Sequence, residues 1–297
     1  MLGVGCWVFI PAPIIPPAAP ERPARHLRIE MADRLVIFLH LPKAAGSTLT
    51  RVIGQQYRRG EIRNLGGKDR AVALQEAADL TRPPAQIRII TGHVPFGVHR
   101  AVHGEFTYIT LLRDPVDRLL SHFHFARQLA SHPMHGDIAS GKLTVLDVAR
   151  RLANMQTRYL AGPDAEADNA SDAARLARAK ENLSNHFSVA GVVERFDEAL
   201  MLMQRRLGWK VRAFTNSNVG RARSKKAADA GERAAIRALN PQDQELYEWV
   251  AARFEEDLAR EGSGVQAAVN WLRLKNRVLH WSQQLRSLPR SLRQPAA

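Results

Sequence analysis

Short apolar runs alternate with amphipathic stretches along most of this 297-residue chain. Three runs, at 35–39, 87–90 and 106–112, are largely apolar, which is typical of strands that are buried on both faces. A fourth run follows at 189–193, and a weaker one at 210–213 is a further candidate. Amphipathic stretches between and after these runs predict helices at 47–57, 116–130, 145–160, 173–184, 196–207 and 241–261.

Strands that alternate with helices favour a parallel sheet with helices on both of its faces. We therefore expect an α/β fold with a P-loop-like parallel sheet flanked by helices, and a helical C-terminal region. The length suits one main domain, which we place at 31–262. A disordered, proline-rich extension is expected at 1–30 and a basic amphipathic tail at 263–297, and Met1 and Met31 are both candidate translation starts.

The turn after the first strand, with the sequence LPKAAGST, is a candidate anion site. A strand, a tight turn and a helix point backbone N–H groups at an anion. Lys43 adds a positive charge, and Ser47 and Thr48 add hydroxyl donors. In a Walker A loop the lysine directly follows the second glycine. Here Lys43 stands three residues before Gly46, so the turn predicts phosphate binding of another class.

Two more charged or titratable side chains follow the next two strands of the predicted sheet. His93 comes after the second strand, and Arg113 comes after the third. Ligands of parallel sheets bind beyond the carboxyl ends of the strands, so we expect Lys43, His93 and Arg113 to share one site. A neutral imidazole such as His93 can act as a general base. The alternatives are a packed structural histidine and an ion pair of Arg113 with Asp117.

The composition limits the possible partners. The formal net charge of +14 favours anionic partners, and the single cysteine excludes an internal disulfide. No cluster of residues has the spacing of a metal site, so we expect no metal. An aromatic content of 6% offers few platforms for stacking bases, so we expect no nucleic-acid partner.

Three segments, FLHLPKAAGST, GHVPFG and YITLLRDPVDRLLSHFHF, resemble in order the carbohydrate sulfotransferase family that includes heparan sulfate 2-O-sulfotransferase. The segments NMQTRYLAG, VAGVVERFDEAL and LNPQDQELYEWVAARF extend this resemblance over residues 34–261. The resemblance implies a sulfotransferase that uses 3′-phosphoadenosine 5′-phosphosulfate (PAPS) as the sulfuryl donor. A hydroxyl of a glycan or glycolipid would be the acceptor.

The resemblance also implies roles for individual residues. Lys43 would contact the 5′-phosphosulfate bridge, Arg113 and Ser121 would bind the 3′-phosphate, and His93 would be the catalytic base that also contacts the acceptor. The heparan sulfate 2-O-sulfotransferase pattern has a second histidine where this chain has Thr91, so a two-histidine arrangement is not expected. The turn expected to surround the 5′-phosphate is Lys43, Ala44, Ala45, Gly46, Ser47 and Thr48.

Two further segments are expected near the ligands. Arg221 and Arg223 belong to a basic loop that would reach the phosphates of PAPS, although a solvated run of charges is an equal alternative. Arg158 is expected to face the acceptor. A P-loop kinase or other nucleotide-binding protein, and a basic nucleic-acid-binding protein, are the two alternative functions.

The C-terminal tail contains six basic residues and no acidic residue. Its apolar residues recur at steps of three and four, which places them on one helix face. This face could rest on an anionic membrane surface, or pack on the protein itself or on a second subunit. The sequence lacks a signal peptide or spanning segment, so we expect a cytoplasmic protein, and the tail leaves peripheral membrane contact open. The residues of this face are Trp271, Leu274, Val278, Trp281, Leu285 and Leu288.

Overall fold

The computed structural model describes residues 34–65, 87–102, 104–214 and 228–287. These residues form a five-stranded sheet in the order β2-β3-β1-β4-β5, and every pair of neighbouring strands is parallel. The expected α/β fold is confirmed. The strands are β1 (Leu35–Leu39), β2 (Ile62–Leu65), β3 (Ile89–Gly92), β4 (Phe106–Leu112) and β5 (Phe187–Val192).

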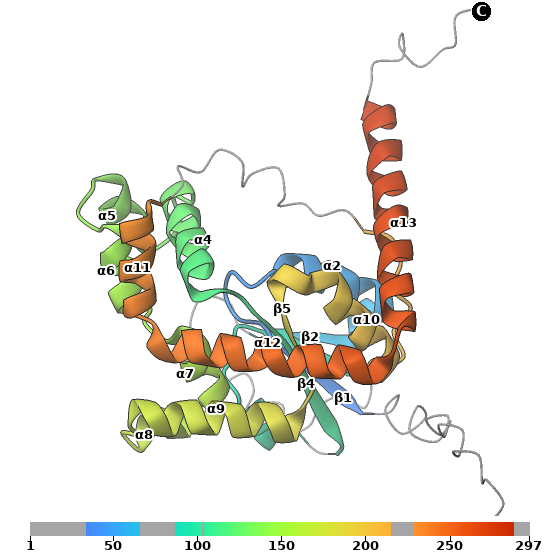
Figure 1. Ribbon diagram of the computed structural model, residues 1–297, viewed down its shortest axis with the longest axis horizontal. Helices are drawn as coiled ribbons and strands as arrows, with labels where there is room; N and C mark the ends of the chain where they lie inside the picture. Colours follow the sequence, from blue (N-terminus) through green and yellow to red (C-terminus); the bar gives the residue numbers. More distant parts are fainter. Residues whose placement is uncertain (1–33, 66–86, 103, 215–227, 288–297) are drawn as a thin grey trace, which may run out of the picture.

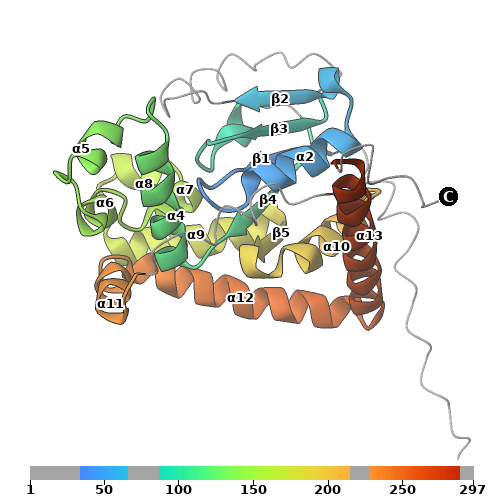
Figure 2. The same cartoon turned by 90° about the horizontal axis from the view of Figure 1, so that it is seen from above.

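Helices cover both faces of the sheet. The helices α2 (Gly46–Gln56) and α10 (Phe196–Leu207) lie on one face, and α9 (Asp172–His186) lies on the other (Figure 1). The long helix α12 (Pro241–Glu261) runs along the side of the sheet where β5 is the edge strand (Figure 2). The remaining α-helices in the described ranges are α4 (Pro115–Gln128), α5 (His135–Ala139), α6 (Val145–Arg151), α7 (Met155–Ala161), α8 (Asp164–Ala167), α11 (Ala230–Ala238) and α13 (Gly264–Ser287).

The main core lies between the sheet and these helices. All residues of β1 and β3 are buried, which explains why their sequences are apolar runs without alternation. Leu49, Val52 and Ile53 of α2 pack against one face of the sheet with no measurable exposure. Smaller apolar clusters join α4 to α6 and α11, so these helices form a separate lobe beside the carboxyl end of β4.

The edge strand β2 is absent from the sequence-based prediction. It pairs with β3, and its two central residues, Arg63 and Asn64, are exposed. An edge strand that buries few side chains has no apolar run to reveal it.

The single helix predicted at 145–160 is wrong, because the chain forms α6 and α7 with a break between them. Asn154 adopts a left-handed conformation there, with φ 50°. Its side-chain oxygen accepts hydrogen bonds from the backbone N–H groups of Gln242 and Asp243, and Asn240 in turn accepts one from the Asn154 N–H. These partners are distant in sequence, so the break is a tertiary effect.

The candidate strand at 210–213 is also wrong, since this described segment has no regular structure. The Gln56 side chain accepts a hydrogen bond from the N–H of Lys210 at 2.7 Å and donates one to its carbonyl at 3.4 Å. The Gln56 side chain thus bonds the backbone groups of Lys210 that a neighbouring strand would bond in a sheet. The predictions for the extension at 1–30 and for Arg221 and Arg223 lie outside the described residues.

Candidate functional site

The turn between β1 and α2 leads into a helix N-terminus that no side chain caps. Lys43 and Ala45 both adopt left-handed backbone conformations, with φ 68° and 56°. Ala45 is the N-cap and offers no side-chain oxygen, and the first turn of α2 contains no acidic residue. Because the first N–H groups of a helix lack partners within the helix, this end favours an anion.

Lys43 and Arg113 meet beside this turn. The Arg113 guanidinium donates a hydrogen bond to the Lys43 carbonyl at 3.2 Å. The Lys43 Nζ lies 3.9 Å from the centre of the Phe125 ring, a cation–π contact. Ser121 and Phe125 are four residues apart on α4, so they share one helix face. Two cations therefore lie at the carboxyl edge of the sheet, and Ser121 stays a predicted third member of this group.

His93 lies at the same edge of the sheet, next to a second histidine. The His93 Nδ1 lies 2.8 Å from the His40 carbonyl, and the two ring centres are 4.1 Å apart. A carbonyl only accepts hydrogen bonds, so Nδ1 carries the proton and Nε2 keeps its lone pair. His93 is thus held in the tautomer that a general base needs.

Both histidines are shifted towards the neutral state. Burial is the main cause that lowers the pKa of His40 to about 3, and the nearby His93 and Lys43 add to this effect. Burial also lowers the pKa of His93 below its ordinary value. The hydrogen bond with the His40 carbonyl opposes this shift, and Lys43 adds to it. A neutral His93 can accept a proton at physiological pH.

The His40 ring lies directly against the start of α2, and this contact requires a glycine. A Cβ built on Gly46 would stand only 1.5 Å from the His40 Nε2. On its other side, His40 stacks on Phe38 at 5.2 Å between ring centres. A second histidine therefore does lie beside His93, but it directly follows β1 and does not stand at position 91.

We expect Gly46→Ala to destabilise the protein by about 1–3 kcal/mol, since the added methyl displaces His40 or the end of α2. Urea unfolding measures this loss. Gly54→Ala on the same helix is the matched control, because a Cβ there meets nothing within 4 Å. The control is expected to keep or raise stability, as alanine favours helices over glycine. Equal stabilities for the two variants would contradict the packing of His40 on Gly46.

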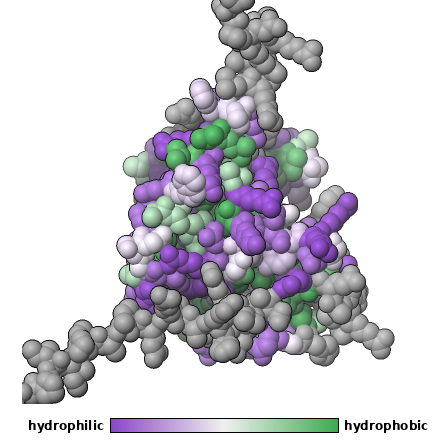
Figure 3. Space-filling view, turned by 90° about the vertical axis from the view of Figure 1, so that its right-hand side faces the viewer, coloured by the Kyte–Doolittle hydropathy of each residue, from purple (hydrophilic) through white to green (hydrophobic). Residues whose placement is uncertain are grey.

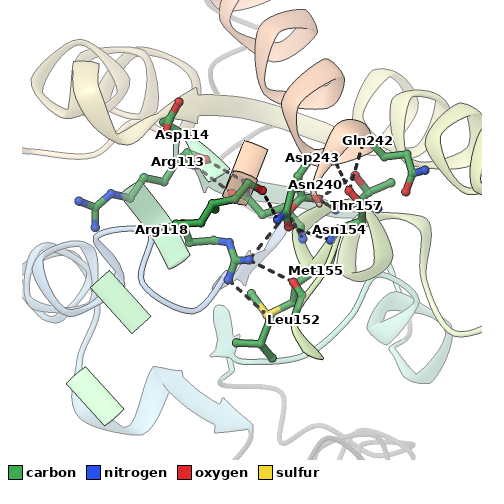
Figure 4. A network of polar contacts seen from close by, with 12 residues as sticks. Arg113, Asp114, Arg118, Leu152, Asn154, Met155, Thr157, Asn240, Gln242 and Asp243 are labelled. Carbon is green, nitrogen blue, oxygen red and sulfur yellow. Dashed lines mark hydrogen bonds and ion pairs between the residues drawn. The ribbon is translucent and has the colours of Figure 1, made fainter. Parts of the chain in front are cut away.

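A buried polar network fixes the position of Arg113 from behind (Figure 4). Gln156 accepts a hydrogen bond from the Arg113 N–H at 3.0 Å and donates one to its carbonyl at 2.9 Å. The Asp243 carboxylate accepts bonds from the N–H groups of Gln156 and Thr157 at 3.1 and 2.8 Å, and also from the Thr157 hydroxyl at 2.9 Å. Asp243 thereby caps α7, and α7 holds the end of β4.

Arg118 places a second charge inside this network. Its side chain is fully buried, donates to the Leu152 carbonyl at 3.3 Å and approaches Asp243 at 4.0 Å. Burial lowers the pKa of Arg118, and Asp243 opposes this shift. An arginine keeps its proton even so, which makes Asp243 the compensating charge.

The other predicted residues differ in their placement. Ser47 is exposed at the start of α2, whereas Ala44 and Thr48 are buried behind the turn. Arg158 lies on α7 two residues after Gln156, so the two point in different directions. Its role at the acceptor stays a prediction.

The alternative ion pair of Arg113 with Asp117 is wrong, because Asp117 pairs with Arg233 at 3.0 Å. Within the described ranges, no three potential metal ligands gather.

The sequence reasoning missed His40, Gln156 and Asp243. His40 has a detectable signal, since it directly follows a buried strand, as His93 and Arg113 do. Gln156 and Asp243 lie in the segments NMQTRYLAG and LNPQDQELYEWVAARF, which contributed only to the resemblance. Their contact over a separation of 87 residues explains why these segments matter together.

The model of the galactose-3-O-sulfotransferase family matches residues 12–284. The chain therefore belongs to this family of carbohydrate sulfotransferases, which confirms the class that the sequence motifs indicate.

Among curated relatives, human galactose-3-O-sulfotransferase 3 is 27% identical over 76% of this chain and 58% of its own length. The mouse protein of the same name is 26% identical over 84% and 62%. Heparan sulfate 2-O-sulfotransferase 1 of Xenopus laevis is 23% identical over 75% and 71%. The chain thus spans about three fifths of the galactose-3-O-sulfotransferases 3 that it matches.

A solved structure of mouse sulfotransferase SULT7A1 complexed with PAP aligns with a TM-score of 0.37 and 15% identity, over 84% of this chain and 94% of that one.

Proposed function

We propose that this protein transfers the sulfuryl group of PAPS to a hydroxyl of a galactose-containing glycan or glycolipid. The observation that carries the proposal is the meeting of Lys43, Arg113 and the uncapped N-terminus of α2 with the neutral His93. Family membership supports sulfuryl transfer over a P-loop kinase. The names of the human and mouse relatives support the 3-hydroxyl of galactose as the acceptor.

The residues at the turn fit a nucleotide with two separate phosphate groups. The start of α2 and Lys43 would hold the 5′-phosphosulfate, because they supply N–H donors and a cation without an acidic residue in the first helical turn. Arg113 would hold the 3′-phosphate, together with Ser121 of α4. PAPS supplies a sulfuryl group on a good leaving phosphate.

His93 and Lys43 would divide the chemistry of the transfer. The His93 Nε2 accepts the proton of the acceptor hydroxyl as its oxygen forms a bond to sulfur. The bond between sulfur and the bridging oxygen of the 5′-phosphate breaks, and its electrons remain on that oxygen. Lys43 stabilises this developing negative charge, as cations do in the related phosphoryl transfers.

The test incubates the full chain with radiolabelled PAPS and three acceptors: a galactose-terminated oligosaccharide, a galactosyl glycolipid and desulfated heparan sulfate. We expect label in a galactoside product, with a mass spectrum that places the sulfate on galactose. Calorimetry with PAP, the desulfated nucleotide, tests the nucleotide site separately. Binding of ATP without binding of PAP would overturn the proposal.

Lys43→Ala is expected to lower kcat by about 10²–10³-fold, since it removes one stabilising group from the leaving oxygen. Lys142→Ala is the matched control, because Lys142 is an exposed lysine in the loop before α6. Initial rates with saturating PAPS measure the effect. A rate equal to that of the control would exclude Lys43 from the transfer step.

A further inference from the structure

Helix α13 carries apolar side chains on two opposite sides. Val265, Val269 and Leu272 are buried in the main core, where α13 packs against the protein. Figure 1 shows α13 at one side of the molecule, with its C-terminal end projecting beyond the other helices. A second set of apolar residues, here called the α13 stripe, is Trp271, Leu274, Val278 and Trp281, with exposed fractions of 58%, 43%, 59% and 66%.

The α13 stripe faces away from the core. At about 100° per residue, its four side chains fall within about 80° of arc, roughly opposite the buried residues of the same helix. The ten helical steps from Trp271 to Trp281 give the stripe a length of about 15 Å. Seen from the side of α13, hydrophobic and strongly hydrophilic surfaces lie next to each other (Figure 3). Four large apolar side chains exposed on one helix face mark an interaction site.

Cations border the stripe on both sides. By helical geometry Lys275 stands on one side of it and Arg277 on the other. The Lys275 Nζ also lies 5.0 Å from the centre of the Trp271 ring. Arg273 belongs to the other side of the helix, because it pairs with Asp197 at 2.9 Å and Glu198 at 3.4 Å. The sequence of α13 contains no acidic residue.

We propose that the α13 stripe binds the surface of an anionic membrane. Tryptophan is the side chain that lipid–water interfaces favour, and basic residues beside it are attracted to anionic headgroups. The helix would lie along the surface, since the opposite side of its first half, at Val265, Val269 and Leu272, is part of the protein core. A second copy of the chain fits less well, because pairing two stripes would bring Lys275 and Arg277 against cations of the same kind. This inference goes beyond the proposed sulfuryl transfer and does not depend on it.

The test is co-sedimentation of the full chain with vesicles of phosphatidylcholine alone, or of phosphatidylcholine with phosphatidylserine. We expect binding to the anionic vesicles only, weakened by added salt. Trp271→Ala/Trp281→Ala is expected to lower the partition coefficient at least about tenfold, as two large apolar side chains are lost. Both tryptophans are exposed, so the fold is expected to persist, which circular dichroism checks.

Two variants with the same change in net charge isolate the electrostatic contribution to vesicle binding. Lys275→Glu/Arg277→Glu is expected to reduce binding at least about fivefold per replaced cation. Lys142→Glu/Arg151→Glu changes the net charge equally at exposed positions outside α13 and is expected to bind nearly as the wild type does. Sulfuryl transfer to a soluble acceptor is expected to be unchanged in the tryptophan variant.

Three results would overturn the proposal. The wild type could remain in the supernatant with anionic vesicles, or the tryptophan variant could sediment as well as the wild type. Light scattering could also show a dimer that the tryptophan variant loses, and a second copy would then cover the α13 stripe.

Discussion

Replacing His93 with alanine is expected to lower kcat by about 10²–10⁴-fold while the affinity for PAP stays nearly unchanged. The structure supports this separation, because His93 is fixed by the His40 carbonyl and not by the turn at Lys43. Initial rates at saturating PAPS measure the loss, and calorimetry measures the affinity. His280→Ala, an exposed histidine on α13, is the control and is expected to react at the wild-type rate.

Added imidazole gives a second readout for the same variant. If His93 removes the proton of the acceptor, a free imidazole in solution restores part of the lost rate. A purely structural histidine would show no such rescue. An unchanged kcat in His93→Ala would remove His93 from the mechanism, even if sulfuryl transfer itself were observed.

The pH profile of the wild type follows from the direction of the pKa shift. Burial lowers the pKa of His93 below its ordinary value of 6.5, so the base stays neutral as the pH falls through 6.5. We expect kcat/KM to remain level there and to fall only in more acidic solution. A rate that halves near pH 6.5 or above would indicate a different base.

Asp243→Ala is expected to destabilise the protein by about 3–5 kcal/mol, because it leaves the charge of Arg118 buried without compensation. The N–H groups of Gln156 and Thr157 also lose their acceptor at the start of α7. Urea unfolding measures the stability. Asp147→Ala, which removes an exposed capping carboxylate from α6, is the control and is expected to change stability far less.

A double-mutant cycle separates the charge pair from the cap. Arg118→Met/Asp243→Asn removes both charges and keeps an acceptor oxygen for α7, so we expect it to be more stable than the sum of the single variants implies. Asp243→Ala, where it still folds, is also expected to bind PAP more weakly, since α7 then holds Gln156 less firmly against Arg113. Wild-type stability in Asp243→Ala would refute the importance of the network.

The sequence predicted the elements that consist of continuous runs of buried apolar residues. The strands β1, β3 and β4 are apolar runs, and Lys43, His93 and Arg113 follow directly from the rule that ligands bind beyond carboxyl strand ends. The meeting of Lys43 with Arg113 is confirmed by a hydrogen bond.

The elements that the sequence could not predict depend on distant partners. The break at Asn154 exists because residues at the start of α12 bind it, and the segment after Trp209 is irregular because Gln56 takes its backbone bonds. The position of the His40 ring against Gly46 and His93 also could not be predicted, since no local pattern shows it.

Because Asp243 supports Arg113, the site is completed late in the synthesis of the chain. Lys43, His93 and Arg113 are all made early, within the first two fifths of the chain. The carboxylate that holds α7 and, through Gln156, the end of β4 is added 130 residues after Arg113 (243 − 113). A nascent chain that ends before Asn240 would therefore contain Lys43, His93 and Arg113, but the position of Arg113 would not yet be fixed. The nucleotide site is expected to become competent only when α12 has left the ribosome and docked.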